Sequence, residues 1–235
     1  MLKNPLVNQH AYTKNRSCDT ALSEAINQIE SGLSAKEHVV IVSLDCSGAF
    51  DNLTFASSMR ALDNFGVSPY IKNWYKQLLS GRQVDSEMFG EKLTVYPSRG
   101  SPQGGVLSPL VWNMAVDTLL SQFSASGPVR AIGYADDVLL IARGIDPPTI
   151  AMNMQRAINT ALSWANSNGL SYNPAKTECC YFHPGRRRPI WPTLRMGGSD
   201  LAYTNTVKYL GVTIDRQLSW REHIFEKCLK AKRLL

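Results

Sequence analysis

The stretch that decides the fold is residues 131–142, AIGYADDVLLIA, in which two short apolar runs flank a pair of neighbouring carboxylates. The runs are rich in Ile, Val and Leu, which suits buried strands, and Asp136-Asp137 suits the tight turn between them. The pattern predicts a β-hairpin with acid at its tip. A purely structural turn between two core strands would have the same sequence, so the hairpin alone does not define a site.

A second strand is predicted to end in a carboxylate. Residues 39–44, VVIVSL, are followed directly by Asp45. If this strand neighbours the hairpin, Asp45 and Asp136 converge at one rim of the sheet, while Asp137 points differently because side chains alternate along a strand. Clustered carboxylates repel one another unless a cation lies between them, and hard oxygen donors suit Mg²⁺. Two such ions can hold the attacking and leaving oxygens of a phosphoryl transfer.

Three motifs in chain order resemble the palm of reverse transcriptases, above all those of non-LTR (LINE-type) retrotransposons. They are Asp45, residues 101–109 (SPQGGVLSP) and residues 134–137 (YADD). The resemblance implies an α+β palm with an antiparallel sheet packed on helices, and an RNA-directed DNA polymerase that adds dNTPs to a DNA primer on an RNA template. It implies that residues 1–37 end the fingers, residues 38–216 form the palm, and residues 217–235 begin the thumb.

The resemblance also assigns metal ligands and a proton donor. Asp45, Asp136 and Asp137, with the backbone carbonyl of Cys46, would hold two Mg²⁺ ions, or Mn²⁺ in their place. Lys176, in the NPAKT run at 173–177, would lie near the incoming nucleotide and donate a proton to pyrophosphate. An exposed lysine after a turn is the alternative for Lys176.

Further residues would contact the nucleotide and the primer. Phe50 would pack under the sugar and exclude a 2′-hydroxyl, although core packing at a strand-to-helix turn explains the same residue. Gln103 and Gly104 would lie over the template–nucleotide pair. The hairpin over residues 206–215 would be the primer grip, with Tyr209, Leu210 and Gly211 at its turn.

Two other functions stay open on the sequence. The family's catalytic unit is longer than this chain, with fingers strands expected before Met1 and more thumb expected after Leu235, so a non-catalytic palm that holds RNA or protein is the main alternative. A two-metal nuclease would use similar carboxylates but gives Gln103 and Tyr209 no role.

The composition limits the kinds of molecule that the chain is expected to bind and the place where it is expected to act. The net charge of +6 and the pI near 9.1 favour a polyanionic partner. No apolar run reaches the roughly 18 to 20 residues of a membrane span, and residues 1–10 lack the apolar segment of a secretion signal. The five cysteines form no C-x-x-C pair and are expected to be reduced thiols in an intracellular protein, since Cys179-Cys180 with His183 lacks a fourth zinc ligand.

Periodicity and capping predict the remaining elements. Ser17 should cap a helix that ends at Gly32. The helix after Ser68-Pro69 should bury Trp74 and Tyr75. Further predicted elements are helices over 55–65, 108–123, 147–168 and from 218 onward, a hairpin over 82–97, a strand over 179–182, and a basic loop at 186–188.

Overall fold

A five-stranded sheet forms the centre of the computed structural model, which describes residues 6, 8–124, 126–185 and 190–233. The strand order is β4-β5-β1-β6-β9, and all pairs are antiparallel except β6 with β9. The strands are β4 (Val129–Tyr134), β5 (Asp137–Gly144), β1 (His38–Leu44), β6 (Glu178–Phe182) and β9 (Tyr203–Thr204). The predicted acidic hairpin and the predicted strand before Asp45 are therefore neighbours, as β4–β5 and β1.

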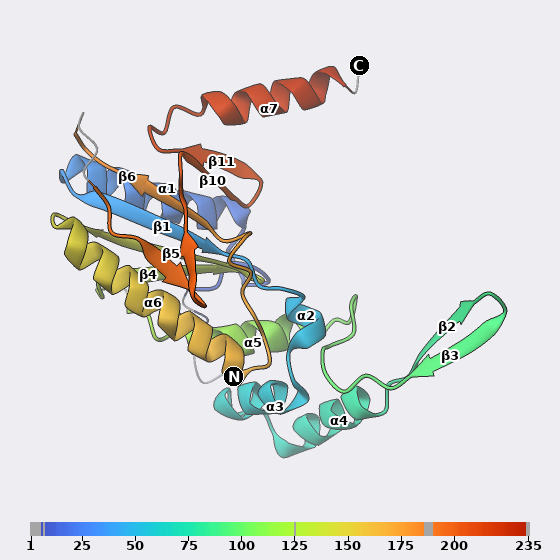
Figure 1. Ribbon diagram of the computed structural model, residues 1–235. Helices are drawn as coiled ribbons and strands as arrows, with labels where there is room; N and C mark the ends of the chain where they lie inside the picture. Colours follow the sequence, from blue (N-terminus) through green and yellow to red (C-terminus); the bar gives the residue numbers. More distant parts are fainter. Residues whose placement is uncertain (1–5, 7, 125, 186–189, 234–235) are drawn as a thin grey trace.

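Helices cover both faces of this sheet (Figure 1). Val39 and Ile41 of β1 pack against α1 (Cys18–Ser34), whereas Val40 and Val42 point to the opposite layer. That layer contains α5 (Ser108–Leu120) and α6 (Pro147–Ser167). Because side chains alternate along a strand, a strand buried on both faces is apolar on both, which explains the apolar run at residues 39–42 of β1.

Helix α1 begins where predicted but continues past Gly32. Ser17 accepts a hydrogen bond from the Thr20 N–H and caps the helix, which extends to Ser34. Gly32 is buried within the helix, and a Cβ added there would lie 2.5 Å from Cγ2 of Val39. The glycine permits close approach of helix and strand and does not end the helix, so the predicted stop was wrong.

A helical layer and a projecting hairpin follow β1. They are α2 (Ala49–Asn52), α3 (Phe55–Asn64), α4 (Pro69–Ser80), β2 (Val84–Met88) and β3 (Glu91–Val95). Tyr75 of α4 is buried, as predicted, but Trp74 is 50% exposed and the prediction that it is a core residue was wrong. Only one stripe of α4, including Tyr75 and Leu79, packs inward, so the adjacent position faces solvent.

The C-terminal part adds two small hairpins and a last helix. They are β7 (Leu194–Met196) with β8 (Ser199–Leu201), β10 (Thr206–Tyr209) with β11 (Val212–Asp215), and α7 (Arg221–Lys232). No residue of α7 is buried. The basic loop predicted at residues 186–188 lies outside the described residues. All five cysteines are free thiols.

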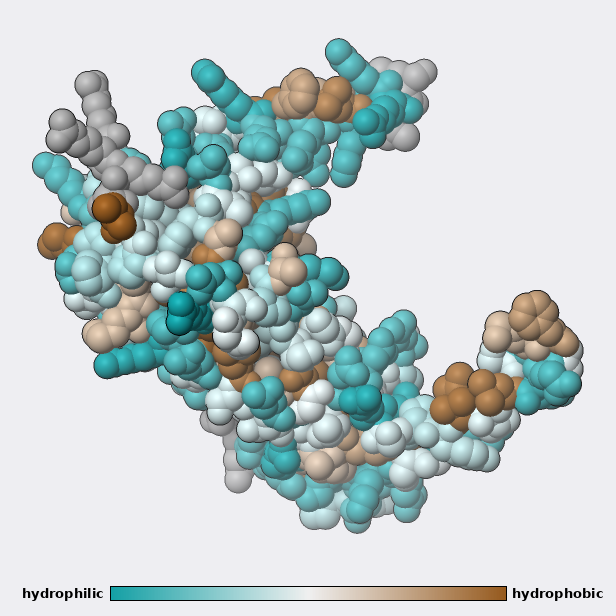
Figure 2. Space-filling view, in the orientation of Figure 1, coloured by the Kyte–Doolittle hydropathy of each residue, from teal (hydrophilic) through white to brown (hydrophobic). Residues whose placement is uncertain are grey.

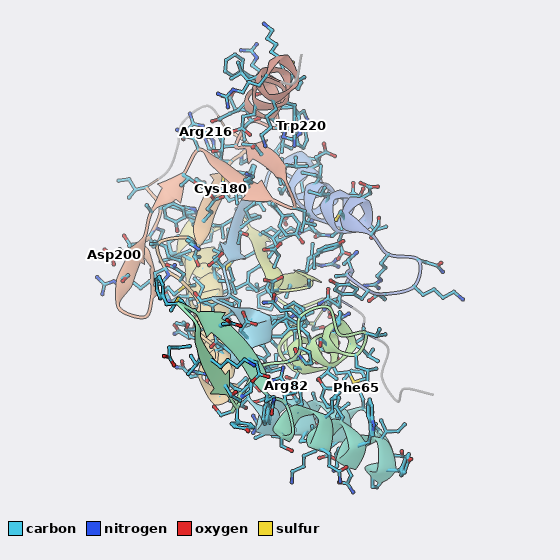
Figure 3. The ribbon with its side chains drawn as sticks, turned by 90° about the vertical axis from the view of Figure 1, so that its right-hand side faces the viewer. Phe65, Arg82, Cys180, Asp200, Arg216 and Trp220 are labelled. Carbon is cyan, nitrogen blue, oxygen red and sulfur yellow. The ribbon has the colours of Figure 1, made fainter. Side chains whose placement is uncertain are left out.

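The surface is hollowed between α7 at one end and the β2–β3 hairpin at the other (Figure 2). Figure 3 looks toward this side, with Arg82 near the base of the hairpin and Trp220 below α7. Every residue of β2 and β3 is exposed. None of the helices that the structure describes has the length and apolarity to cross a membrane.

Candidate active site

The three predicted carboxylates lie at one rim of the central sheet. The last β1–β5 pair is Leu44 with Val138, so Asp45 and Asp137 come next in the same register. Tyr134 pairs with Asp137 in the hairpin, which leaves Ala135 and Asp136 as its two-residue turn. Opposed residues of an antiparallel pair share a face, so the register directs Asp137, more than Asp136, toward Asp45. The expectation that Asp136 is the one to face Asp45 was therefore wrong, because Asp136 lies in the two-residue turn and not in the strand.

The charges at this rim influence one another. Partial burial, then the charges of Asp136 and Asp45, raise the pKa of Asp137 to about 6, although its side chain retains contact with solvent. Burial, then the same two carboxylates, also raise the pKa of the Cys46 thiol to about 12. The thiol is therefore neutral, and the local field favours a cation.

The backbone beyond Asp45 leaves the Cys46 carbonyl free of the segment that it pairs with. Cys46 forms a bridge with Tyr172 in which Ser47 N–H donates to the Ser171 carbonyl and Asn173 N–H donates to the Asp45 carbonyl, at 3.0 Å each. In an antiparallel bridge of this kind, the N–H and C=O of Cys46 itself point away from the partner segment. This orientation suits the predicted role of the Cys46 carbonyl as a metal ligand.

The donor set has the chemistry that a hard divalent cation prefers, since it contains three carboxylates and a carbonyl and Asp137 titrates abnormally high. Across residues 6, 8–124, 126–185 and 190–233, however, no three His, Cys, Asp or Glu side chains form a ready-made metal-binding group. Mutual repulsion keeps uncompensated carboxylates apart. The residue types fit Mg²⁺.

Phe50 and Asp51 of α2 both hydrogen-bond to the loop that carries Gln103. Phe50 is half-buried, with its ring centroid 5.4 Å from that of Trp112, and its carbonyl accepts a hydrogen bond from Ser101 N–H at 2.8 Å. The exposed Gln103 donates through Nε2 to both oxygens of Asp51, at 3.0 and 3.2 Å. Sequence reasoning missed Asp51, although its position next to Phe50 and its charge on a short helix were visible signals.

Gly100 allows the same loop to lie close against α2. Gly100 has φ +76°, and a Cβ there would lie 2.5 Å from the Asp51 carbonyl oxygen. Gly104, with φ +77°, is exposed and has no atom within 4 Å of the position of a Cβ. The loop is therefore tightly attached at Gly100 and open at Gly104, where backbone can approach a ligand.

Lys176 lies on a turn that is attached to the carboxylate rim. Asn173, whose N–H bonds the Asp45 carbonyl, accepts the Ala175 N–H on its side chain and the Thr177 hydroxyl on its carbonyl. Lys176 is exposed on this turn. The turn thus places Lys176 in the neighbourhood of Asp45, and Asn173 is a second residue that sequence reasoning did not single out.

The predicted primer grip is a tight hairpin packed near the same rim. Leu210 and Gly211 have φ of +47° and +78°, the pair of positive values that a type I′ turn needs. Tyr209 is buried, and its hydroxyl has no hydrogen-bond partner among the described residues. Burial, followed by Asp137, Glu24 and Cys18, raises the pKa of Tyr209, so the ring lies within reach of the charge at the rim.

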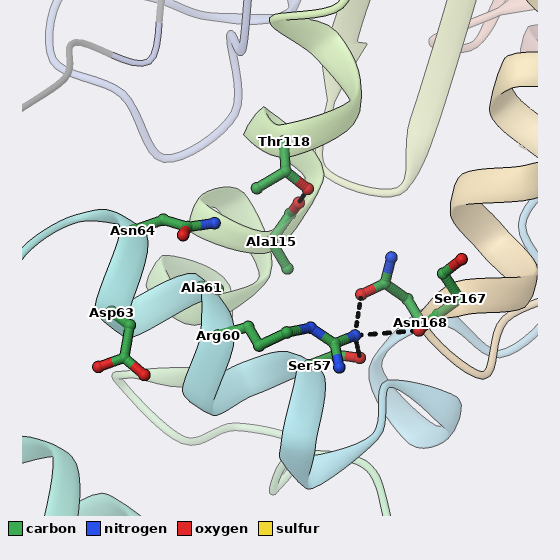
Figure 4. A pocket seen from close by; sticks show the side chains of 9 residues that line it. All are labelled: Ser57, Arg60, Ala61, Asp63, Asn64, Ala115, Thr118, Ser167 and Asn168. Atoms are coloured by element: carbon green, nitrogen blue, oxygen red, sulfur yellow. Dashed lines mark hydrogen bonds between the residues drawn. The ribbon is translucent and has the colours of Figure 1, made fainter.

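A separate polar cavity of about 380 Å³ lies between α3, α5 and the end of α6 (Figure 4). Arg60 crosses it and donates to Ser57, to the Ser167 carbonyl and to Asn168. None of the predicted catalytic, nucleotide or primer residues lines it. We assign this cavity no part in the site.

A sheet covered on both faces, with carboxylates on a strand end and on the neighbouring hairpin tip, defines the palm of a template-directed polymerase. The fold class predicted from the sequence is confirmed. Over residues 4–214 the chain matches the family described as reverse transcriptase (RNA-dependent DNA polymerase), and the chain belongs to this family.

Its relatives include proteins of non-LTR retrotransposons. The chain is 27% identical over 193 residues to the putative 115 kDa protein in type-1 retrotransposable element R1DM of Drosophila melanogaster, covering 82% of this chain and 18% of the relative. It is also 27% identical to the RNA-directed DNA polymerase from mobile element jockey of Drosophila funebris, covering 86% and 22%. The chain therefore spans about a fifth of the length of such relatives.

Solved structures support the fold. Apo telomerase from Candida tropicalis, truncated from its C-terminal domain, matches with a TM-score of 0.63 and 13% identity over 89% of this chain and 39% of that chain. Telomerase from Candida albicans in complex with a fragment of telomeric RNA matches with a TM-score of 0.60 and 13% identity, covering 90% and 35%. At this identity the likeness concerns the fold alone.

Proposed function

We propose that this chain carries the chemistry of an RNA-directed DNA polymerase, which joins a deoxynucleotide to the 3′-hydroxyl of a DNA primer on an RNA template. The observation that carries the proposal is the meeting of Asp45, Asp136 and Asp137 at one sheet rim, supported by their mutual electrostatic effect on Asp137. Membership of the reverse transcriptase family supports the same reaction.

The residues at the rim would have separate roles in the reaction. Asp45, Asp136, Asp137 and the Cys46 carbonyl would bind Mg²⁺, or Mn²⁺ in its place. When bound, the divalent ions lower the pKa of the primer hydroxyl and neutralise charge on the pyrophosphate. Lys176 would stand near the leaving group and supply it with a proton, which its exposure and its attachment to Asp45 through Asn173 support.

The surrounding elements would bind the substrates. Phe50 would contact the nucleotide sugar, Gln103 and Gly104 would lie over the nascent base pair, and the turn at Tyr209, Leu210 and Gly211 would hold the primer. We assign residues 1–37 to the end of the fingers, 38–216 to the palm and 217–235 to the start of the thumb.

The test is Mg²⁺-dependent extension of a labelled DNA primer on an RNA template by the 235-residue chain. Asp45→Asn and Asp136→Asn should each lower incorporation by roughly 100-fold or more, because each removes a carboxylate that stabilises the transition state. The matched control is Asp200→Asn, since Asp200 is an exposed acid that pairs with Arg195 on the β7–β8 hairpin. Its incorporation should equal that of the wild type.

Binding of the RNA–DNA duplex is measured in parallel by fluorescence anisotropy. Wild-type protein that binds the duplex but extends no primer, with binding unchanged in Asp45→Asn, would replace the polymerase by a non-catalytic nucleic-acid-binding palm. Primer extension that survives Asp136→Asn would remove the assignment of the metal site.

A further inference from the structure

The residue before Asp136 has an unusual backbone conformation. Ala135 has φ +53°, in the left-handed region, which is unfavourable for a residue with a Cβ. Such a conformation persists only where the surrounding structure holds it. The direction of the Asp136 side chain depends on this backbone, so the contacts of Ala135 bear directly on the site.

Both backbone groups of Ala135 are held by one side chain from the N-terminal segment. Oε1 of Gln9 accepts the Ala135 N–H at 3.1 Å, and Nε2 of Gln9 donates to the Ala135 carbonyl at 3.4 Å. Gln9 is completely buried, with 0% of its surface exposed. A wholly buried amide that satisfies both groups of a strained residue is a specific arrangement, because a buried polar group without partners would be costly.

Gln9 is itself fixed in place. The residues on either side of it pair with the hairpin, since His10 N–H donates to the Gly133 carbonyl and Gly133 N–H donates to the Asn8 carbonyl, at 2.8 Å each. Arg16 donates to the Gln9 carbonyl at 3.0 Å. A Cβ at Gly133 would lie 3.3 Å from Nε2 of Gln9, so glycine there gives the amide room.

A second side chain, Trp112 of α5, also hydrogen-bonds to this turn. Nε1 of Trp112, on α5, donates to the Ala135 carbonyl at 2.8 Å. The Trp112 ring also packs on Phe50, at 5.4 Å between centroids. The Ala135 carbonyl thus accepts from both Gln9 and Trp112, and Trp112 connects the acidic turn to the residue proposed to contact the nucleotide sugar.

We propose that Gln9 is a positioning residue of the active site: its amide holds Ala135 in the left-handed conformation and so fixes the direction in which the Asp136 carboxylate leaves the tip of the hairpin. Trp112 is the second positioning residue on the same carbonyl. This inference rests on the proposed polymerase function. It makes the segment around Gln9, 126 residues upstream in the chain, a structural part of the acidic turn.

The test compares Gln9→Met, which keeps the length of the side chain and removes its amide, with Asn113→Leu. Asn113 is the matched control because it is equally buried and donates to the Ala11 carbonyl in the same segment, without contacting Ala135. Gln9→Met should lower kcat for nucleotide addition by roughly 10- to 100-fold, as expected for a reacting group displaced by about 1 Å. It should also raise the Mg²⁺ concentration for half-maximal activity several-fold, with KM for the dNTP within about twofold of wild type.

A second pair of variants removes one hydrogen bond each from an indole. Trp112→Phe loses the bond to Ala135 but keeps an aromatic ring beside Phe50. Trp164→Phe is its control, because Trp164 donates to Thr118 in the core, away from the turn. Trp112→Phe should raise the Mg²⁺ requirement, whereas Trp164→Phe should leave it unchanged. Thermal unfolding of all four variants separates loss of folding from loss of positioning.

Amide hydrogen exchange at Ala135 gives a readout that does not need activity. Gln9→Met should accelerate this exchange about tenfold or more relative to Asn113→Leu. Unchanged exchange at Ala135, or a kcat and Mg²⁺ requirement equal to those of Asn113→Leu at equal stability, would overturn the inference. Wild-type protein that extends no primer would instead refute the polymerase proposal, and the exchange comparison would still decide whether Gln9 holds the turn.

Discussion

At the scale of single residues, Phe50 lies partly in the core and partly at the surface. Its ring packs on Trp112 and its side chain is half-buried, so the exposed part can meet a ligand while the rest is held by the core. If this ring contacts the nucleotide sugar, Phe50→Val should reduce the preference for dNTPs over rNTPs by roughly 10- to 100-fold, the range for a few methylene-sized contacts. Competitive incorporation of the two nucleotides on one template measures the preference.

Phe55→Val provides the control for this substitution. Phe55 is also partly buried, and its ring lies 5.9 Å from the Arg82 guanidinium carbon rather than beside Trp112. Its loss should leave sugar preference unchanged. An unaltered preference in Phe50→Val, at undiminished activity, would show that Phe50 serves the core alone.

The residues that sequence reasoning missed share one physical property. Asp45, Asp136 and Asp137 were predictable because each stands at the end of an apolar run, where a charge has no place in the core. The partners of Gln9 and Asp51 lie 126 and 52 residues away, so even the local signals at Asp51 did not specify its contact with Gln103. Their roles depend on the tertiary contacts that bring the partners together.

At the scale of elements, the turn between β11 and α7 depends on one carboxylate. Asp215 accepts hydrogen bonds from the N–H groups of Gln217, Ser219 and Trp220 and from the Ser219 hydroxyl. Helix α7 has no buried residue, so hydrogen bonds hold it: those of Asp215 at its start, and those that His223, Glu226 and Lys227 make to Thr213 and Gly211. Asp215→Ala should destabilise the turn by about 1 kcal/mol, as for loss of a helix cap, and accelerate exchange of the Trp220 amide about fivefold at pH 7.

The same carboxylate predicts a pH dependence. Partial burial acts to raise the pKa of Asp215, but the hydrogen bonds from Ser219, Trp220 and Gln217 outweigh it and the pKa lies below the ordinary 3.8. For a lowered carboxyl pKa, the stabilisation is present above the unfolded-state value and is lost as the pH falls through the folded-state value. The difference between wild type and Asp215→Ala should therefore shrink as the pH falls below 3.8 and vanish once the pH has passed the lowered pKa of the folded state. The control is Asp200→Ala. Among the described residues, the Asp200 carboxylate accepts a hydrogen bond from the Arg195 side chain and from no backbone N–H, so its loss should leave exchange of the Trp220 amide unchanged at neutral and at acidic pH.

Element types were more predictable than element ends. The β4–β5 hairpin and helix α6 occur where alternation, periodicity and caps placed them, because those signals act within a few residues. The predicted end of α1 was wrong because Gly32 lets the helix lie close to Val39. The prediction for Trp74 was wrong because no described residue packs over that side of α4. Both errors concern what lies opposite an element, which its own sequence does not specify.

At the scale of the whole molecule, the palm is a packed body with two exposed arms. The β2–β3 hairpin has no buried residue and neither does α7, and the hollowed face lies between them (Figure 2). A two-stranded ribbon alone is marginally stable in water, so its amides should exchange quickly in the free protein, unlike those of β1 and β5. The arms are thus suited to become ordered on a ligand.

An RNA–DNA duplex should occupy this hollow and protect the elements around it. We expect slower amide exchange in β10, β11, α7 and the loop at residues 100–105 when the duplex is present, with β1 and β5 unchanged. The net charge of +6 makes the binding electrostatic, so the protection should decrease steeply between 50 and 200 mM salt, the range in which phosphate contacts weaken. Protection of α3 and the end of α6 around Arg60, with none along the hollow, would place the nucleic acid at the Arg60 cavity and separate it from the carboxylate rim.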